Sequence, residues 1–136
     1  KGRLIKRFLA DAREFADARR DNPALAEFLT PYVAGLEELE SVTQWLAEVS
    51  AENREELGAA AVDYLRLMGM VCLARMWVGM AEVALSHAGG DNTGFYEAKI
   101  KTSRYFMQRL MPLTSALVSA IRSGADTLMD LEADAY

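Results

Sequence analysis

The sequence contains few of the residues from which most catalytic sites are built. Its 136 residues include a single cysteine and a single histidine. A disulfide or a zinc cluster needs several thiols or imidazoles, so the chain alone supplies neither. The apolar stretch MGMVCLARM around Cys72 predicts a buried, unreactive thiol, and His87 is expected at the surface near a helix end. We therefore predict no catalytic, cofactor-binding or metal-ligating residue in this chain.

Basic residues are scarce as well. Lys and Arg number 15 against 20 Asp and Glu, which gives a net charge of −5 and an isoelectric point of about 4.9. Proteins that bind nucleic acids usually present a basic face to the phosphates, so the charge argues against such a role. With three prolines, nine glycines and 51% hydrophobic residues, neither disorder nor low complexity is indicated. The length suits one domain, residues 1–136, that buries about two thirds of its unfolded surface.

The beginning of the sequence, KGRLIKRF, lacks a start methionine and an apolar run of signal-peptide length. We therefore expect a piece of a longer, cytoplasmic protein, in which upstream residues carry the chemistry.

Hydrophobic spacing indicates helices throughout. No segment shows the strict alternation of a half-buried strand, whereas four segments repeat apolar residues at intervals of three and four. These are residues 3–20, a helix after Pro31, and residues 52–87 and 92–123. The sequence thus predicts an all-α fold: a mostly antiparallel four-helix bundle with short accessory helices.

Several helix boundaries are marked locally. Asn22-Pro23 and Thr30-Pro31 each resemble a cap followed by proline in the first turn, which predicts a short helix over residues 23–29 before the second long helix. Gly124 is expected to end the last long helix in a left-handed conformation, with one more short helical turn in ADTLMDL.

The first two long helices have clear apolar faces. In the first, the charged residues Arg7, Asp11, Arg13 and Asp17 lie mostly away from that face. The predicted core residues are Ile5, Phe8, Ala12 and Phe15 in the first helix, and Tyr32, Leu36, Leu39, Val42, Thr43, Trp45, Leu46 and Val49 in the second.

The third helix is apolar on nearly all sides, since only Arg66 and Arg75 are charged between Asp63 and Glu82. Its length would suffice to cross a membrane, but arginines nine positions apart point to opposite sides and leave no single polar face. We expect a soluble helix that is buried on most sides, and no membrane insertion. One side alternates large and small residues, and the other is uniformly apolar. They are Leu65, Gly69, Cys72, Met76, Gly79 and Val83, and Tyr64, Leu67, Val71, Ala74, Val78 and Leu85.

This surplus of apolar surface has two consequences. In a four-helix bundle, the neighbouring helices cover only part of each helix, whereas the third helix is apolar on two sides. We therefore expect a further domain or a second copy of the chain to cover part of its apolar surface. Because small residues admit a neighbouring backbone, we also expect Gly79→Leu to overpack the fold.

The last long helix contains Pro112, which removes a backbone donor and crowds the carbonyl of Gln108. Contacts on both sides of the proline are expected to hold this helix together while it bends. The predicted seam consists of Tyr96, Ile100, Ser103, Met107, Leu110, Thr114, Leu117 and Ile121.

The motifs that most resemble sites have simpler explanations. A di-iron bundle site needs Glu-x-x-His pairs, whereas Glu82 and His87 are five residues and about 140° apart. SHAGGDNTG lacks the strand and the glycine-lysine signature of a phosphate loop, so it predicts a turn followed by a cap. The acidic run Glu37, Glu38 and Glu40 predicts a solvated face rather than a cation site.

Two segments carry a family resemblance: FYEAKIKTSRYFMQRLMPLTSALVSAIRSGADTLMDL, residues 95–131, and AAAVDYLRLMGMVCLARMWVGMAEVAL, residues 59–85. They resemble the C-terminal helical domain of long acyl-CoA dehydrogenases, including those similar to 3-methylmercaptopropionyl-CoA dehydrogenase. The first third of the chain is generic helix and adds little.

The resemblance implies that the parent enzyme uses FAD to dehydrogenate an acyl-CoA thioester, with the flavin taking a hydride from the β-carbon and a glutamate removing the α-proton. Both groups belong to upstream domains, and no residue of this chain matches their motifs. The chain would then bind no FAD itself, and would pack on the upstream catalytic domains or on another subunit of a homo-oligomer.

Two other functions stay open. One is a stand-alone interaction or regulatory bundle, for example a homodimer, with no dehydrogenase attached. The other is a bundle that binds a small molecule. A stand-alone bundle would lack an upstream coding sequence for a dehydrogenase core, which distinguishes it from the module. A bundle that binds a small molecule would show saturable ligand binding.

Overall fold

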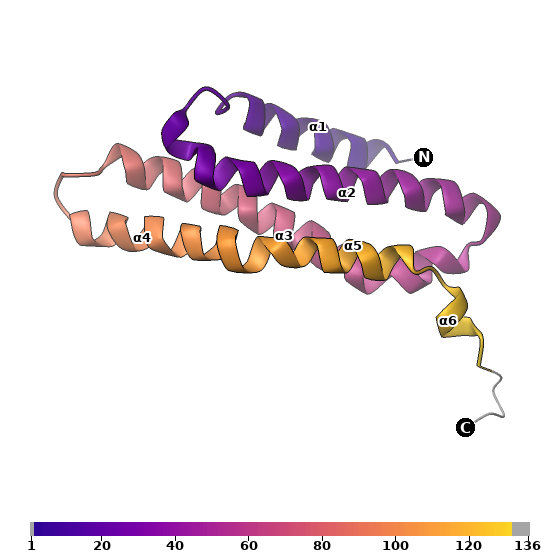
Figure 1. The fold of residues 1–136 in the computed structure, drawn as a ribbon. Helices are drawn as coiled ribbons and strands as arrows, with labels where there is room; N and C mark the ends of the chain where they lie inside the picture. The colour runs from indigo at the N-terminus through magenta and orange to yellow at the C-terminus, as the bar shows by residue number, and fades with distance from the viewer. Residues whose placement is uncertain (1, 132–136) are drawn as a thin grey trace.

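The computed structural model describes residues 2–131, and every regular element within them is a helix (Figure 1). The predicted all-α fold is confirmed. The elements are α1 (Arg3–Asp17), the 3-10 turn η1 (Pro23–Leu25), α2 (Ala26–Glu52), α3 (Glu55–Ser86), α4 (Thr93–Tyr105), η2 (Phe106–Leu110), η3 (Met111–Leu113), α5 (Thr114–Arg122) and α6 (Asp126–Met129).

The longer elements form four helical rods, namely α1, α2, α3 and the run from α4 to α5, and they alternate in direction (Figure 1). The hairpin of α2 and α3 contacts the continuous run from α4 to α5, and α1 lies back along α2. Short connections between consecutive rods favour this antiparallel arrangement. The core therefore lies mainly between α2, α3 and the α4–α5 run, with α1 as an outer layer.

The faces of α1 and α2 follow the predicted spacing. In α1, Ala12 is fully buried and Phe8 and Phe15 are half-buried, while all four charged residues named above are exposed. In α2, the seam around Tyr32 and Leu39 is buried. Amphipathic helices are the case in which sequence alone identifies the packed side.

The second predicted helix start is wrong, although the first is confirmed. The side chain of Asn22 accepts a hydrogen bond from the amide of Ala24 at 3.1 Å, as a helix cap does. Pro31, in contrast, lies inside α2, which begins at Ala26 and passes through it without interruption. Proline removes only one donor near the helix start, and buried residues on both sides, Phe28 and Tyr32 among them, hold the helix together.

The helix around Pro112 continues because its hydrogen-bond pattern changes. Residues Phe106–Leu110 form a π-turn, in which the amide of Met111 donates to the carbonyl of Phe106, and Met111–Leu113 then form a 3-10 turn. The wider π-turn accommodates the missing donor of Pro112. Contacts on both sides are buried as predicted, at Ser103 and Met107 before it and Ile121 after it.

The loops confirm one predicted conformation and correct another. Gly124 is left-handed, with φ of 78°, and a short α6 follows it as expected. Before α4, Asn92 is also left-handed, with φ of 62°, and its side chain caps nothing. The hydroxyl of Thr93 instead donates to the carbonyl of Gly90 at 2.5 Å, so the predicted turn forms without the predicted side-chain cap.

The environment of α3 differs from the prediction on one side. Leu67, Val71 and Val78 are buried as expected. The opposite side is open, and only 22% of the most apolar 18-residue window of this helix is buried, although α3 is long and apolar enough to cross a membrane by length and composition. The expectation of burial on most sides is therefore wrong for this chain, because the buried residues of α3 recur every three or four positions and so lie on one side of the helix.

Candidate interaction surface

The open side of α3 carries an uncharged row of residues at heptad spacing, which we call the α3 seam. Its members are Val62, Leu65, Gly69, Cys72, Met76, Gly79 and Val83. Leu65 is 70% exposed, Val62 62%, Met76 56% and Val83 54%. Apolar side chains repeated every three or four residues are what a helix presents to a packing partner. Within residues 2–131, the larger side chains of the α3 seam are therefore left mostly exposed.

Small residues interrupt the seam in a regular way. A Cβ placed at Gly69 or at Gly79 would meet nothing within 4 Å. The expectation that Gly79→Leu overpacks the chain's own fold is therefore wrong, because the space next to Gly79 is open among the residues that the structure describes. The prediction of a buried Cys72 is wrong for the same reason, since this residue is only half-buried on the seam.

A groove of about 500 Å³ opens over the C-terminal half of the seam. Phe15 of α1 forms one wall and Phe95 of α4 the other, and its floor includes Gly79. The guanidinium of Arg75 lies 4.8 Å from the centre of the Phe15 ring, and the amine of Lys99 lies 5.3 Å from that of Phe95. Both cations therefore stack on the walls, and the groove itself is apolar.

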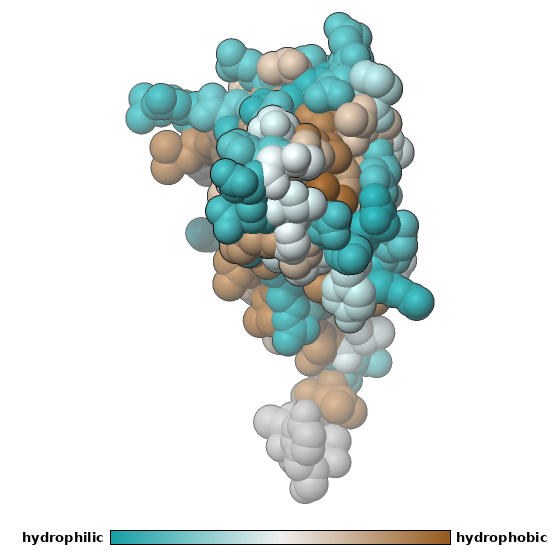
Figure 2. All heavy atoms as spheres, turned by 90° about the vertical axis from the view of Figure 1, so that its left-hand side faces the viewer, coloured by the Kyte–Doolittle hydropathy of each residue, from teal (hydrophilic) through white to brown (hydrophobic). Residues whose placement is uncertain are grey.

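Hydrophobic side chains also reach the surface at this end of the molecule. Figure 2 looks along the bundle from the end that carries the α3–α4 loop, and hydrophobic atoms lie open between hydrophilic ones. Sequence reasoning missed Phe15 as a groove wall and took it for core, and it did not single out Phe95. The groove combines residues of three separate helices, α1, α3 and α4, so helical spacing gives no signal for it.

The structure keeps Glu82 and His87 in separate contacts. Glu82 pairs with Arg19 at 2.9 Å. His87 ends α3, where its Nδ1 donates to the carbonyl of Val83 at 2.9 Å and its ring stacks on Tyr96 at 4.6 Å. The predicted surface position of His87 at a helix terminus is confirmed.

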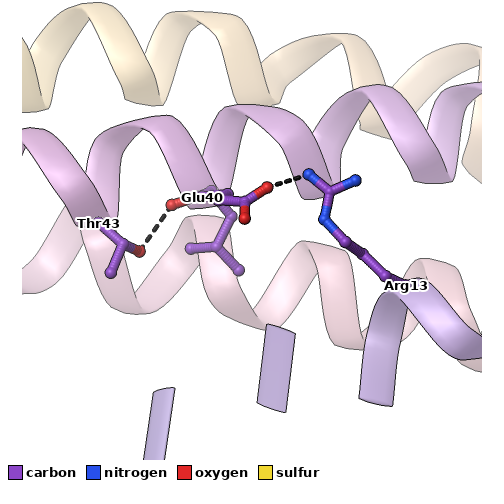
Figure 3. Close-up of polar contacts among 4 residues, drawn as sticks. Arg13, Glu40 and Thr43 are labelled. Carbon is purple, nitrogen blue, oxygen red and sulfur yellow. Dashed lines mark hydrogen bonds and ion pairs between the residues drawn. The ribbon is translucent and has the colours of Figure 1, made fainter. Parts of the chain in front are cut away.

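The acidic run of α2 is divided between partners. Glu40 is paired with Arg13 of α1 (Figure 3), Glu38 accepts a hydrogen bond from the hydroxyl of Ser115 at 2.6 Å, and Glu37 is exposed. Across residues 2–131, no three side chains of metal-ligating type gather. The part of the chain that the structure describes therefore offers no cluster suited to a metal.

The one thiol is poorly suited to nucleophilic chemistry. Burial raises the pKa of Cys72, with a smaller opposing effect from Arg75. A thiol with a raised pKa stays protonated at neutral pH and is a weak nucleophile. Cys72 therefore adds no activated nucleophile to the α3 seam.

Comparison with known families gives a match over most of the sequence. The profile of a family described as "Acetyl-CoA dehydrogenase C-terminal like" matches residues 5–132, which is nearly the whole chain. No curated protein matches the sequence.

Proposed function

We propose that this chain, which belongs to the acetyl-CoA dehydrogenase C-terminal-like family, is the terminal helical module of an FAD-dependent acyl-CoA dehydrogenase. Within that family, we propose the type similar to 3-methylmercaptopropionyl-CoA dehydrogenase, on the basis of the sequence blocks at residues 59–85 and 95–131. The module packs against other protein surface and carries no chemistry of its own.

The observation that supports a packing role is the exposed, uncharged α3 seam. Monomeric soluble proteins rarely leave a long contiguous apolar strip in water, and such strips mark protein contacts. The seam runs from Val62 to Val83, about 32 Å along a helix. In the parent enzyme it would be covered by the catalytic core or by another subunit.

The described residues do not fit FAD themselves. A flavin dinucleotide needs donors for its pyrophosphate, usually backbone amides at a glycine-rich helix start. The groove over Gly79 is lined almost wholly by apolar atoms, and its two cations, Arg75 and Lys99, stack on aromatic rings. This apolar lining supports our proposal that the flavin binds in another part of the parent enzyme, where we also place the catalytic base.

Two measurements test this function. The purified chain is expected to show no flavin absorption and no oxidation of acyl-CoA with an artificial electron acceptor, and robust activity would overturn the proposal. The upstream coding sequence is expected to specify a flavin-binding acyl-CoA dehydrogenase core. Translation that starts directly before Lys1 would instead favour the second candidate, a stand-alone interaction bundle that uses the same seam.

A further inference from the structure

We propose that the α3 seam pairs with the α3 seam of a second copy of this chain, antiparallel, around a two-fold axis at Cys72. This inference deepens the proposed packing role by naming its partner. It rests on the order of large and small residues along the seam and on the groove that lies over one half of it.

The seam is complementary to its own reverse. Leu65 and Gly79 lie seven residues before and after Cys72. Gly69 lies three before it and Met76 four after it. In an antiparallel pair centred on Cys72, Leu65 of one copy therefore faces Gly79 of the second, and Met76 faces Gly69, to within one residue, or about 1.5 Å.

The ends of the seam complete the pattern. Val62 and Val83 lie ten residues before and eleven residues after Cys72, so two medium-sized side chains meet there. A glycine opposite a large side chain lets two helices approach closely without a void or a clash. A parallel pair would set Leu65 against its own copy and Gly69 against its own copy, which alternates crowding with empty space.

The surroundings of Gly79 agree with this pairing. The groove there lies between Phe15 and Phe95, and a Cβ on Gly79 would meet none of the chain's own atoms within 4 Å. Leu65, which is 70% exposed, is the side chain that the second copy brings to this groove. An unrelated partner could also fill the groove. Its presence would not explain why α3 carries both the exposed Leu65 and, at Gly79, the space that fits such a side chain.

Charge does not oppose the pairing. From Val62 to Val83 the seam contains no charged residue. Arg66 and Arg75 flank it on opposite sides of α3, since nine residues turn the helix by about half a revolution. In the proposed register neither arginine lies level with its own copy, so like charges are not brought together.

Cross-linking of single-cysteine variants tests the register. In the Cys72→Ser background, a tagged Leu65→Cys chain is mixed with an untagged Gly79→Cys chain and treated with a short bis-maleimide. The expected main product is the mixed dimer that joins the two positions. Dominant cross-linking of Leu65→Cys to itself would show a parallel pair, and absence of any dimer would show a monomer, and either result overturns the inference.

A swap of sizes tests the complementarity. In sedimentation velocity, Gly79→Leu is expected to weaken the dimer about tenfold or more, because two leucines then meet. The double variant Leu65→Ala, Gly79→Leu restores the large-against-small pattern and is expected to recover most of the affinity. Circular dichroism checks that each variant is folded. Unchanged dimerisation in Gly79→Leu, or a double variant weaker than the single one, would overturn the inference.

These outcomes are separable from those for the proposed function. If the chain is a monomer and its upstream sequence encodes a flavoenzyme core, the self-pairing is excluded and the proposed module function stands. If the chain is a dimer and no such upstream sequence exists, the dehydrogenase-module function is excluded and the self-pairing stands.

Discussion

The hydroxyl of Tyr32 donates a hydrogen bond to the backbone carbonyl of Ala12 at 3.1 Å, within the contact between α2 and α1. The Tyr32 side chain is fully buried, and the ring of Phe15 meets it edge-on, with the ring centres 5.8 Å apart. A buried hydroxyl must find a partner to offset its lost hydration. The outer helix α1 is thus tied to the core by a buried hydrogen bond, in addition to the exposed ion pair of Arg13 with Glu40.

Tyr32→Phe tests the energetic weight of that contact. The ring still packs, but the hydrogen bond is lost, so the free energy of unfolding is expected to fall by about 0.5–1.5 kcal/mol in urea titrations. Tyr105→Phe, at a position that is 60% exposed, is the matched control and should change stability little. Equal effects at both positions would contradict the role given to the buried hydroxyl.

Leu67 and Leu65 compare the two sides of α3 directly. Leu67 is fully buried and Leu65 is 70% exposed, although they are two residues apart in one helix. Leu67→Ala should lower the free energy of unfolding by about 2–5 kcal/mol, because it opens a cavity in the core. Leu65→Ala should change it by about 0.5 kcal/mol or less in dilute chain, where no second copy is bound. The reverse order would mean that the packed side of α3 is assigned wrongly.

At Gly35, α2 closely approaches Met111, the residue before Pro112. A Cβ at Gly35 would lie 2.5 Å from the Cε of Met111 and 3.6 Å from Cγ2 of Val71. Gly35→Val should therefore cost about 1–3 kcal/mol more than Gly58→Val, since Gly58 also lies in a helix but has nothing within 4 Å of its Cβ. Thermal unfolding of both variants measures the difference, and similar melting temperatures would argue against tight packing at Gly35.

The pair of Arg104 on α4 and Glu27 on α2 predicts a pH dependence. Nε of Arg104 donates to Oε2 of Glu27 at 2.6 Å, and a second guanidinium nitrogen donates to Oε1 at 2.7 Å. This hydrogen bonding is the main cause that lowers the pKa of Glu27. Because the pKa is lower in the folded chain, the pair stabilises the fold above the unfolded-state pKa of about 4.3 and loses that effect as pH falls through the folded-state value.

Urea titrations of the wild type and Glu27→Gln measure this contribution. Both side chains are more than 40% exposed, so solvent screening limits the difference to about 0.2–1 kcal/mol at pH 7. The difference should shrink toward zero as the solution is made more acidic than the folded-state pKa. Glu97→Gln, at an exposed position on α4, serves as the control. A difference that grows on acidification would contradict the assignment.

Local patterns predicted most of the fold, because the spacing of apolar residues in an amphipathic helix identifies the side that packs on the core. The buried residues of α1 and α2, and the seam on both sides of Pro112, follow directly from spacing. Pro31 was taken for a helix start because the local signal, Thr30 before proline, is the same as at Asn22. In the structure α2 runs through Pro31 among buried neighbours, and a π-turn precedes Pro112, and neither outcome is marked in the local sequence.

By itself the sequence determined an all-α chain with too much apolar surface on its third helix, since composition and periodicity are properties of the chain alone. It did not determine which half of α3 faces inward, because a helix that is apolar all round has no side marked for water. The tertiary structure decided this when α3 packed against α2, α4 and α5, since Leu67, Val71 and Val78 became buried while Leu65, Met76 and Val83 stayed outside. The groove between Phe15 and Phe95 likewise exists only once three separate helices have packed together.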